Sequence, residues 1–182
     1  MRSRPALMSR SLVSRSLALL AASALVFSLS ACQKKTPPEP TAAATLPAAP
    51  TIRTDGSLTF YRDTTDIATL DIEIADTDAT RERGLMERPP LSDTQAMLFV
   101  FARAEPQSFW MANTPSPLDI VYVGADSAVV SIAKYTKPFS TEPLPSAGPA
   151  QYVVEVRAGW ADAKGLVPGD KVRWTRNAPP MV

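Results

Sequence analysis

Short apolar segments separated by turn residues are the feature that most limits how this chain can fold. Residues 68–75, ATLDIEIA, alternate apolar and acidic side chains from Leu70 to Ile74, which is the two-residue period of a strand with one buried face. Further short apolar segments lie at 96–101, 108–111, 118–123, 128–135, 151–159 and 166–175. Many short strands at such spacing are typical of an all-β sandwich or barrel.

Two short helices complete the expected fold. Asp76 or Thr77 is suited to cap a helix in DATRERGLM (78–86), and Gly84 ends or bends that helix. A second helix lies in GWADAKG (159–165) and ends at Gly165, because glycine readily adopts the left-handed conformation found at helix C-termini. The expected fold class is therefore mainly β, a compact sandwich or barrel with two short helices.

The first 32 residues have the pattern of a bacterial export signal. Basic residues precede an apolar segment at 17–29, which is shorter than the about 20 residues that a membrane-spanning helix needs. The segment ends in Leu29-Ser30-Ala31-Cys32, which resembles the lipobox of bacterial lipoproteins. Residues 1–31 are therefore predicted to be a lipoprotein signal peptide, with Cys32 as the lipidated residue. The alternative is a plain export signal followed by an unpaired thiol.

Lipidation of Cys32 predicts a membrane anchor, because acyl chains partition into bilayers. Gln33, rather than Asp, follows the cysteine, which in the Gram-negative sorting pattern indicates the outer membrane of the cell envelope, facing the periplasm. Residues 32–51 are rich in Pro and Ala and are predicted to be a linker. Residues 52–176 then form a single β-rich domain and residues 177–182 a tail. The domain folds without an internal disulfide, because Cys32 is the only cysteine.

Charge and residue content argue against several function classes. Of the 19 basic residues, four arginines (Arg2, Arg4, Arg10 and Arg15) fall in the export signal, which leaves 15 against 18 acidic residues and a net charge of −3. A nucleic-acid partner, which favours a basic patch, is therefore not expected. The chain has no His, which excludes Ser-His-Asp and Cys-His catalysis and the usual imidazole metal sites. We expect neither a metal nor a cofactor.

Six motifs occur in a fixed order along the domain: RERGLMERPPL, AMLFVF, SFWMANT, PLDIVYV, YVVEVRAGWA and GLVPGDKV. Together they resemble the domain of unknown function 192 family, an uncharacterised bacterial and archaeal family, from about Leu70 to Val172. The resemblance implies a compact, jelly-roll-like β-sandwich with small helices, and it implies no agreed activity. Family members often have Lys at the position of Ala112, so any role of that lysine does not transfer to this chain.

One stretch, SFWMANTPSPLDIVYV (108–123), contains most of the candidate ligand-binding residues. Trp110 is suited to stack on a sugar ring, although a core position is the favoured interpretation. Asn113 and Thr114 precede a proline, at a corner where such side chains most often bond their own backbone. Asp119 lies in a strand that is apolar on both faces, so we expect it to be at least partly buried. It then accepts hydrogen bonds from backbone N–H groups or hydroxyls of the NTPSP corner, pairs with an arginine such as Arg83, or anchors a ligand.

Charged residues elsewhere in the domain add two further possibilities. Arg83 is the fifth ligand-binding candidate, because it either pairs with an acidic residue on the sheet or holds a carboxylate or phosphate group. Glu155 and Arg157 are two residues apart on one strand face, where a surface salt bridge is the favoured interpretation.

Three functions remain open from the sequence. The first is a non-catalytic envelope lipoprotein that binds a cell-envelope component such as a glycan. The second is a hydrolase of envelope glycans that uses Asp119 and Glu155, which requires two carboxyl groups about 5 to 9 Å apart. The third is a structural or assembly partner of another envelope protein. The sequence favours binding over catalysis.

Overall fold

The computed structural model describes residues 51–177, which form one seven-stranded sheet in the order β5-β4-β6-β3-β2-β1-β7, with two short helices. The elements are β1 (Gly56–Arg62), β2 (Thr65–Ala75), α1 (Asp78–Arg83), β3 (Gln95–Phe109), β4 (Leu118–Val123), β5 (Val129–Ala133), β6 (Leu144–Arg157), α2 (Trp160–Ala163) and β7 (Lys171–Arg176). The predictions for the signal peptide, Cys32, the linker up to residue 50 and tail residues 178–182 lie outside the described residues.

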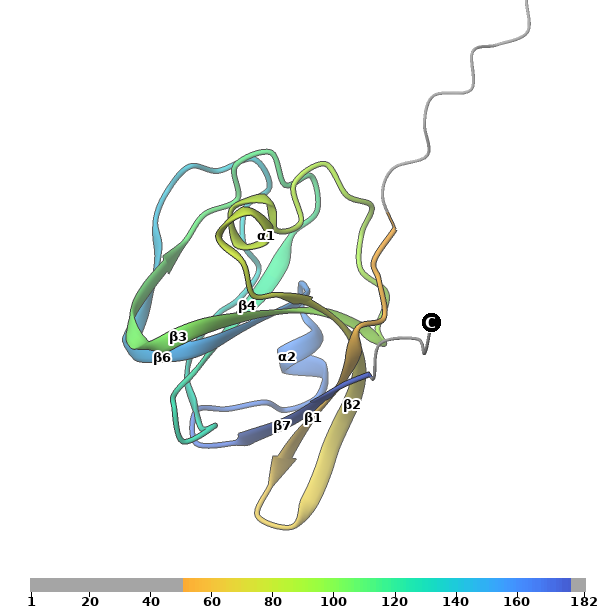
Figure 1. The fold of residues 1–182 in the computed structure, drawn as a ribbon, viewed down its shortest axis with the longest axis vertical. Helices are drawn as coiled ribbons and strands as arrows, with labels where there is room; N and C mark the ends of the chain where they lie inside the picture. Colours follow the sequence, from red (N-terminus) through yellow and green to blue (C-terminus); the bar gives the residue numbers. More distant parts are fainter. Residues whose placement is uncertain (1–50, 178–182) are drawn as a thin grey trace, which may run out of the picture. The chain divides into compact units, whose positions relative to one another are not determined.

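The expectation of a mainly β domain with two short helices is confirmed. The strands form a single curled sheet, in which β2 and β3 pair in parallel and the other neighbours pair antiparallel (Figure 1). The sequence patterns did not predict β1, although its residues Leu58 and Phe60 are fully buried. No helix in residues 51–177 is long and apolar enough to span a membrane.

The sheet buries both of its faces, each against a separate hydrophobic cluster. The cluster on one face, here called the Trp160 core, includes Leu58, Phe60, Ile72, Leu98, Val121, Val154, Val156 and Trp160. The cluster on the opposite face, here called the Phe99 core, includes Leu85, Met97, Phe99, Met111, Leu118, Ile120, Tyr122 and Val153. The two helices lie on opposite sides of the β3–β6 ribbon, α2 on the Trp160 side and α1 on the Phe99 side (Figure 1).

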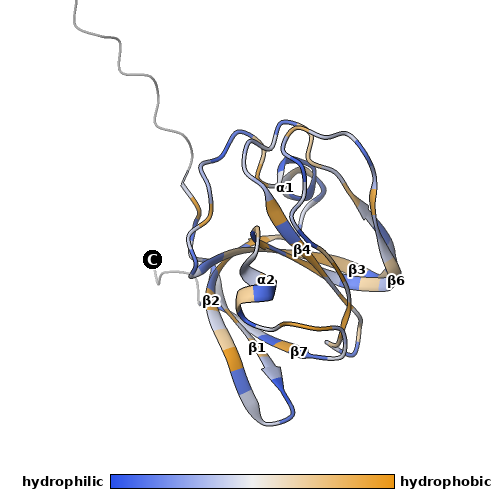
Figure 2. Cartoon of the chain, turned by 180° about the vertical axis from the view of Figure 1, so that it is seen from behind, coloured by the Kyte–Doolittle hydropathy of each residue, from blue (hydrophilic) through white to orange (hydrophobic). Residues whose placement is uncertain are grey.

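Helix α1 begins with a complete capping box. The Thr77 hydroxyl accepts from the backbone N–H of Thr80, and the Thr80 hydroxyl accepts from the backbone N–H of Thr77, so two donors of the first turn are satisfied. Thr77, rather than Asp76, is therefore the N-cap. The helix is hydrophilic and has no buried residue (Figure 2), so its caps and the contacts of Arg81 with β3 hold it in position.

Gly84 ends α1, as the sequence suggested. Its φ of 46° is a conformation that residues with a Cβ rarely adopt, and a Cβ at this position would lie 3.3 Å from the ring of Phe99. The missing side chain therefore lets the end of α1 approach the Phe99 core closely. This approach places α1 beside β3, where the candidate site lies.

Candidate functional site

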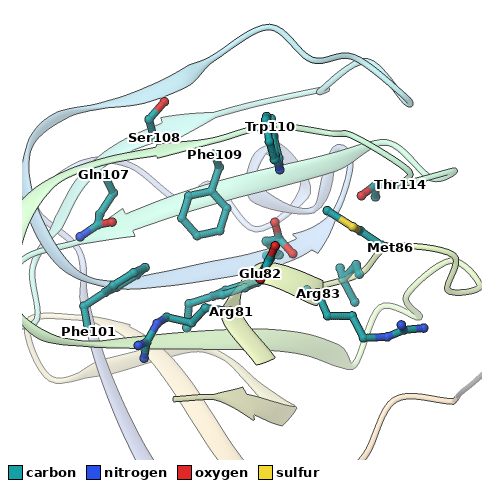
Figure 3. A pocket seen from close by; sticks show the side chains of 14 residues that line it. Arg81, Glu82, Arg83, Met86, Phe101, Gln107, Ser108, Phe109, Trp110 and Thr114 are labelled. Atoms are coloured by element: carbon teal, nitrogen blue, oxygen red, sulfur yellow. The ribbon is translucent and has the colours of Figure 1, made fainter. Parts of the chain in front are cut away.

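A cleft of about 270 Å³ opens between α1 and the part of β3 from Phe99 to its C-terminal end (Figure 3). Its lining comes from α1 and the following turn, from β3 and the corner after it, and from one residue of β6. These residues are Arg81, Glu82, Arg83, Gly84, Leu85, Met86, Phe99, Phe101, Gln107, Ser108, Phe109, Trp110, Thr114 and Glu155. The volume is near the lower end of the about 300–1,000 Å³ typical of small-ligand sites, so it suits a group no larger than about one ring.

Aromatic rings form the inner wall of the cleft. Phe109 stands nearly perpendicular to Phe99 at a centroid distance of 4.9 Å and nearly perpendicular to Tyr122 at 6.1 Å. Phe101 makes a third edge-to-face contact with Phe109 at 6.5 Å. Such edge-to-face pairs fix ring orientation, so the wall is rigid and apolar.

Trp110 lies at the mouth of this cleft, which corrects the favoured interpretation of a core tryptophan. Its side chain is 55% exposed, because β3 ends at Phe109 and Trp110 is the first residue beyond the sheet. The indole Nε1 forms no hydrogen bond with any other described residue, whereas the indole of the buried Trp160 donates to the carbonyl of Asp93. Trp110 therefore presents both a ring face and a free donor to the solvent.

The corner after Trp110 positions Thr114 in the cleft and leaves Asn113 outside it. Thr114 is buried, and its hydroxyl donates to the Ala112 carbonyl at 3.3 Å, as expected for a residue that bonds its own backbone. Asn113 is exposed at a φ of 54°, and its carbonyl accepts from the N–H of Glu87 at 2.8 Å. The Asn113 backbone thus joins this corner to the segment that follows α1.

Two arginines of α1 line the cleft in different ways. Arg81 is held in place, since it donates to the carbonyls of Asp76 and Val100 and pairs with Asp78 while its guanidinium lies 5.4 Å from the Phe101 ring centre. Arg83 lies at the rim, with its guanidinium extending away from Phe109 (Figure 3). Only a long, exposed pair with Glu87, at 3.9 Å, engages Arg83 in the described part of the chain.

Asp119 is fully buried on the other face of the sheet. Its two oxygens accept from the backbone N–H groups of Tyr135 at 2.9 Å and of Ala161 at 3.0 Å. The carboxylate therefore secures the first turn of α2 and the end of the β5 hairpin. Of the roles considered for this residue, the backbone acceptor is the one found. Its donors are Tyr135 and Ala161, however, and not the NTPSP corner or Arg83.

The carboxyl group inside the cleft is that of Glu155. Because β4 and β6 pair Ile120 with Glu155 and Asp119 with Val156, the side chains of Glu155 and Asp119 point to opposite faces of the sheet. The carboxyl pair required by the glycan-hydrolase hypothesis is therefore not formed. Arg157 does not pair with Glu155 either, because it forms an ion pair with Asp93 at the surface.

Glu155 is only 4% exposed, and its Oε2 has no hydrogen-bond partner in residues 51–177. Burial raises the pKa of this carboxyl from 4.5 to about 8, because the charged form loses its hydration. Burial, with a smaller contribution from Glu155, also raises the pKa of Tyr122, whose hydroxyl donates to the Leu144 carbonyl. Glu155 is therefore predominantly neutral at pH 7.

The sequence of this domain matches a known protein family. The sequence profile of the family DUF192, described as an uncharacterised ACR, matches residues 60–174. The chain belongs to the DUF192 family. The match extends beyond both ends of the region marked by the six motifs.

Two solved structures resemble this DUF192 domain. A protein of unknown function from Novosphingobium aromaticivorans is 39% identical, with a TM-score of 0.62 over 65% of this chain and 84% of that chain. A protein from Sinorhizobium meliloti, described as a candidate transcription regulator, is 30% identical, with a TM-score of 0.63 over 65% of this chain and 92% of that chain. A comparison with curated proteins gives no match.

The cleft of the DUF192 domain thus brings together three of the five candidates, Arg83, Trp110 and Thr114. Asn113 and Asp119 do not line it. Glu155 was assigned to the surface from sequence, yet the signal for burial was present, since an acid in YVVEVR stands among valines on both faces of its strand. Residues 51–177 contain no group of three or more His, Cys, Asp or Glu residues placed to hold a metal ion.

Proposed function

We propose that this DUF192 protein is a lipid-tethered envelope protein that binds a glycan through the cleft beside Trp110, without transforming it. The observation that carries the proposal is the exposed indole at the mouth of a rigid aromatic cleft. A sugar ring has one apolar face and a rim of hydroxyl groups, so it matches an aromatic ring flanked by polar groups.

A second exposed aromatic extends this surface. Phe139 is 64% exposed, and its backbone N–H donates to the carbonyl of Thr114 at 3.1 Å. The next residue, Ser140, accepts from the N–H of Met111, which directly follows Trp110. The loop that carries Phe139 is therefore attached to the corner that carries Trp110, which supports a binding surface longer than a single sugar unit.

Binding is favoured over hydrolysis by the carboxyl groups available. Hydrolysis of a glycosidic bond usually requires two carboxyl groups with different protonation states on either side of the bond. Glu155 lies deep in the cleft, and Asp119 is on the opposite face of the sheet. The other acidic residue of the cleft, Glu82, is exposed on α1, whereas Glu155 is buried on β6.

The membrane anchor is part of the proposal and rests on the lipobox sequence ending at Cys32. Expressed in a Gram-negative host, the full chain is expected to incorporate radiolabelled palmitate and to fractionate with the outer membrane. The variant Cys32→Ser should do neither. Labelling that persists in this variant would exclude Cys32 as the lipidation site.

Titration of the full chain, solubilised in detergent, with the tetramer of N-acetylglucosamine tests the binding function. We expect Trp110→Ala to weaken binding at least roughly tenfold, because truncation of a central aromatic contact commonly costs more than 1 kcal/mol. Tyr135→Ala is the matched control. Tyr135 is 60% exposed but lies outside the cleft, where its hydroxyl donates to the Asp162 carboxylate of α2. Equal affinities of the two variants, absence of binding by the wild type, or release of shorter sugars during incubation would each contradict the proposal.

A further inference from the structure

We propose that the cleft recognises the N-acetyl group of an amino sugar, with the Glu155 carboxyl donating a hydrogen bond to the acetyl carbonyl oxygen. This inference rests on the proposed glycan-binding function and specifies the substrate class. Its basis is a buried polar group, without a partner among residues 51–177, at the inner end of an aromatic cleft.

The position of Glu155 makes it a recognition group rather than a structural one. In β6 it lies opposite Met97 of β3 and Ile120 of β4, two apolar side chains that offer it no hydrogen bond. Buried polar atoms are nearly always paired, and an unpaired one costs stability. Glu155 lines the cleft although Oε2 itself is enclosed, so a turn of the carboxyl group would let a molecule in the cleft supply the partner that Oε2 lacks within residues 51–177.

The protonation state of Glu155 determines which partner fits. The charged groups of the cleft all come from α1, namely Arg81, Glu82 and Arg83, and Tyr122 is the titratable neighbour on β4. A carboxyl with its pKa raised to about 8 by burial is neutral at pH 7 and has one O–H to donate. A neutral carbonyl oxygen accepts this bond.

The walls of the cleft match the rest of an acetamido group. Phe99, Phe109 and Leu85 give an apolar surface near the inner end, which suits the acetyl methyl. Trp110 at the mouth is placed to stack on the sugar ring that carries the group (Figure 3). A free amino sugar fits less well, since an ammonium at the inner end would meet a protonated carboxyl that offers it no charge, and at the rim two arginines outnumber the one acid, Glu82.

Two variants of Glu155 separate hydrogen bonding from packing. Glu155→Gln keeps a neutral donor of nearly the same shape, whereas Glu155→Leu removes the donor and keeps an apolar side chain. With the full chain in detergent at pH 6.5 and the N-acetylglucosamine tetramer as probe, we expect Gln to bind within a few-fold of the wild type. We expect Leu to bind roughly tenfold or more weakly. Thermal unfolding of each variant shows whether it is folded.

The pH dependence of binding provides a second readout. Wild-type affinity should fall as the pH rises through about 8, because deprotonation removes the O–H donor, while Glu155→Gln should bind equally at pH 6.5 and 9.5. The tetramer of glucosamine, which lacks acetyl groups, should bind much more weakly than the acetylated tetramer at pH 6.5.

The possible failures of the two proposals are distinguishable. If Trp110→Ala weakens binding but folded Glu155→Leu binds like the wild type, glycan binding stands and recognition of the acetyl group is overturned. If the glucosamine tetramer binds better and Glu155→Gln abolishes that binding, the site recognises an ammonium group and the inference is wrong. If neither tetramer binds the wild type, both proposals fail.

Discussion

At the scale of single residues, two buried acids on opposite faces of one sheet have opposite roles. Asp119 accepts two backbone N–H bonds and is structurally satisfied, whereas Glu155, in the cleft, has an oxygen that no group in the described part of the chain bonds. Sequence reasoning identified the buried position of Asp119 and missed that of Glu155. The difference arose because β6 was assumed to expose one face, and strand alternation alone does not reveal that a sheet is covered on both sides.

Glu155 makes the stability of the domain depend on pH. Its folded pKa of about 8 exceeds the ordinary 4.5, so between these values the folded state binds more protons than the unfolded state. Raising the pH across this window therefore destabilises the fold, by roughly 5 kcal/mol at most. Glu155→Gln should remove this slope in urea unfolding measured at pH 5 and pH 8. Parallel pH profiles for the two proteins would contradict the assignment.

Replacing Asp119 should affect stability rather than binding. Asp119→Ala leaves the N–H groups of Tyr135 and Ala161 without their acceptor, and we expect a loss of roughly 2–4 kcal/mol in the free energy of unfolding. Denaturant melts measure this loss, and glycan titration of the folded variant checks that affinity is unchanged. A loss of glycan affinity without a loss of stability would show instead that Asp119 takes part in binding.

At the scale of elements, α1 buries none of its side chains, so it depends on its caps and on the contacts of Arg81 with β3. The sequence predicted the helix, a cap at Asp76 or Thr77 and an end near Gly84, since capping and glycine signals are local. It did not predict that the helix would form one side of a cleft, because this depends on the contact between Gly84 and Phe99, which are distant in the chain.

Thr77→Ala tests the contribution of the cap. Loss of the reciprocal bonds with Thr80 should destabilise the domain by about 1 kcal/mol. Because α1 carries Arg81 and Arg83, fraying of the helix should also weaken glycan binding. Thr175→Ala, an exposed threonine on β7, is a suitable control. Equal stability of the two variants would show that the capping box is dispensable.

The segment after α1 is tied to β2 by a buried ion pair. Arg88 donates to both oxygens of Glu73, at 2.6 and 2.9 Å, which places Glu73 in the interior although its strand pattern indicated a polar face. Arg88→Met alone leaves a buried carboxylate with only the exposed Arg53 as a charged partner and should cost about 3–5 kcal/mol. The double variant with Glu73→Leu should lose less, as measured by urea unfolding. A larger loss in the double variant would contradict this explanation.

At the scale of the whole domain, stability is concentrated in the middle of the sheet. Strand β6, which is third in the sheet, pairs with the central strand β3 on one side and β4 on the other, and every residue of β4 is buried. Fold class was predictable because strand alternation and turn residues are local signals. The parallel pairing of β2 with β3 and the joining of seven strands into one sheet depend on contacts between distant segments.

Hydrogen exchange should reflect this arrangement. Amides of β4 and of the central part of β6 are expected to exchange slowest, and those of the edge strands β5 and β7 fastest. Mass spectrometry of exchanged peptides measures the order. Equal protection of β7 and β4 would contradict a sheet that opens from its edges.

Because the sheet has a hydrophobic core on each face, the number of residues in β6 is more constrained than the size of its side chains. Adding one residue ahead of Tyr152 would reverse the direction of every side chain from 152 to 157. Glu155 would then point into the Trp160 core, and Val154 and Val156 would point toward the Phe99 core and the cleft. Relatives of this chain should therefore differ in length in the loops that flank β6, and not between residues 152 and 157.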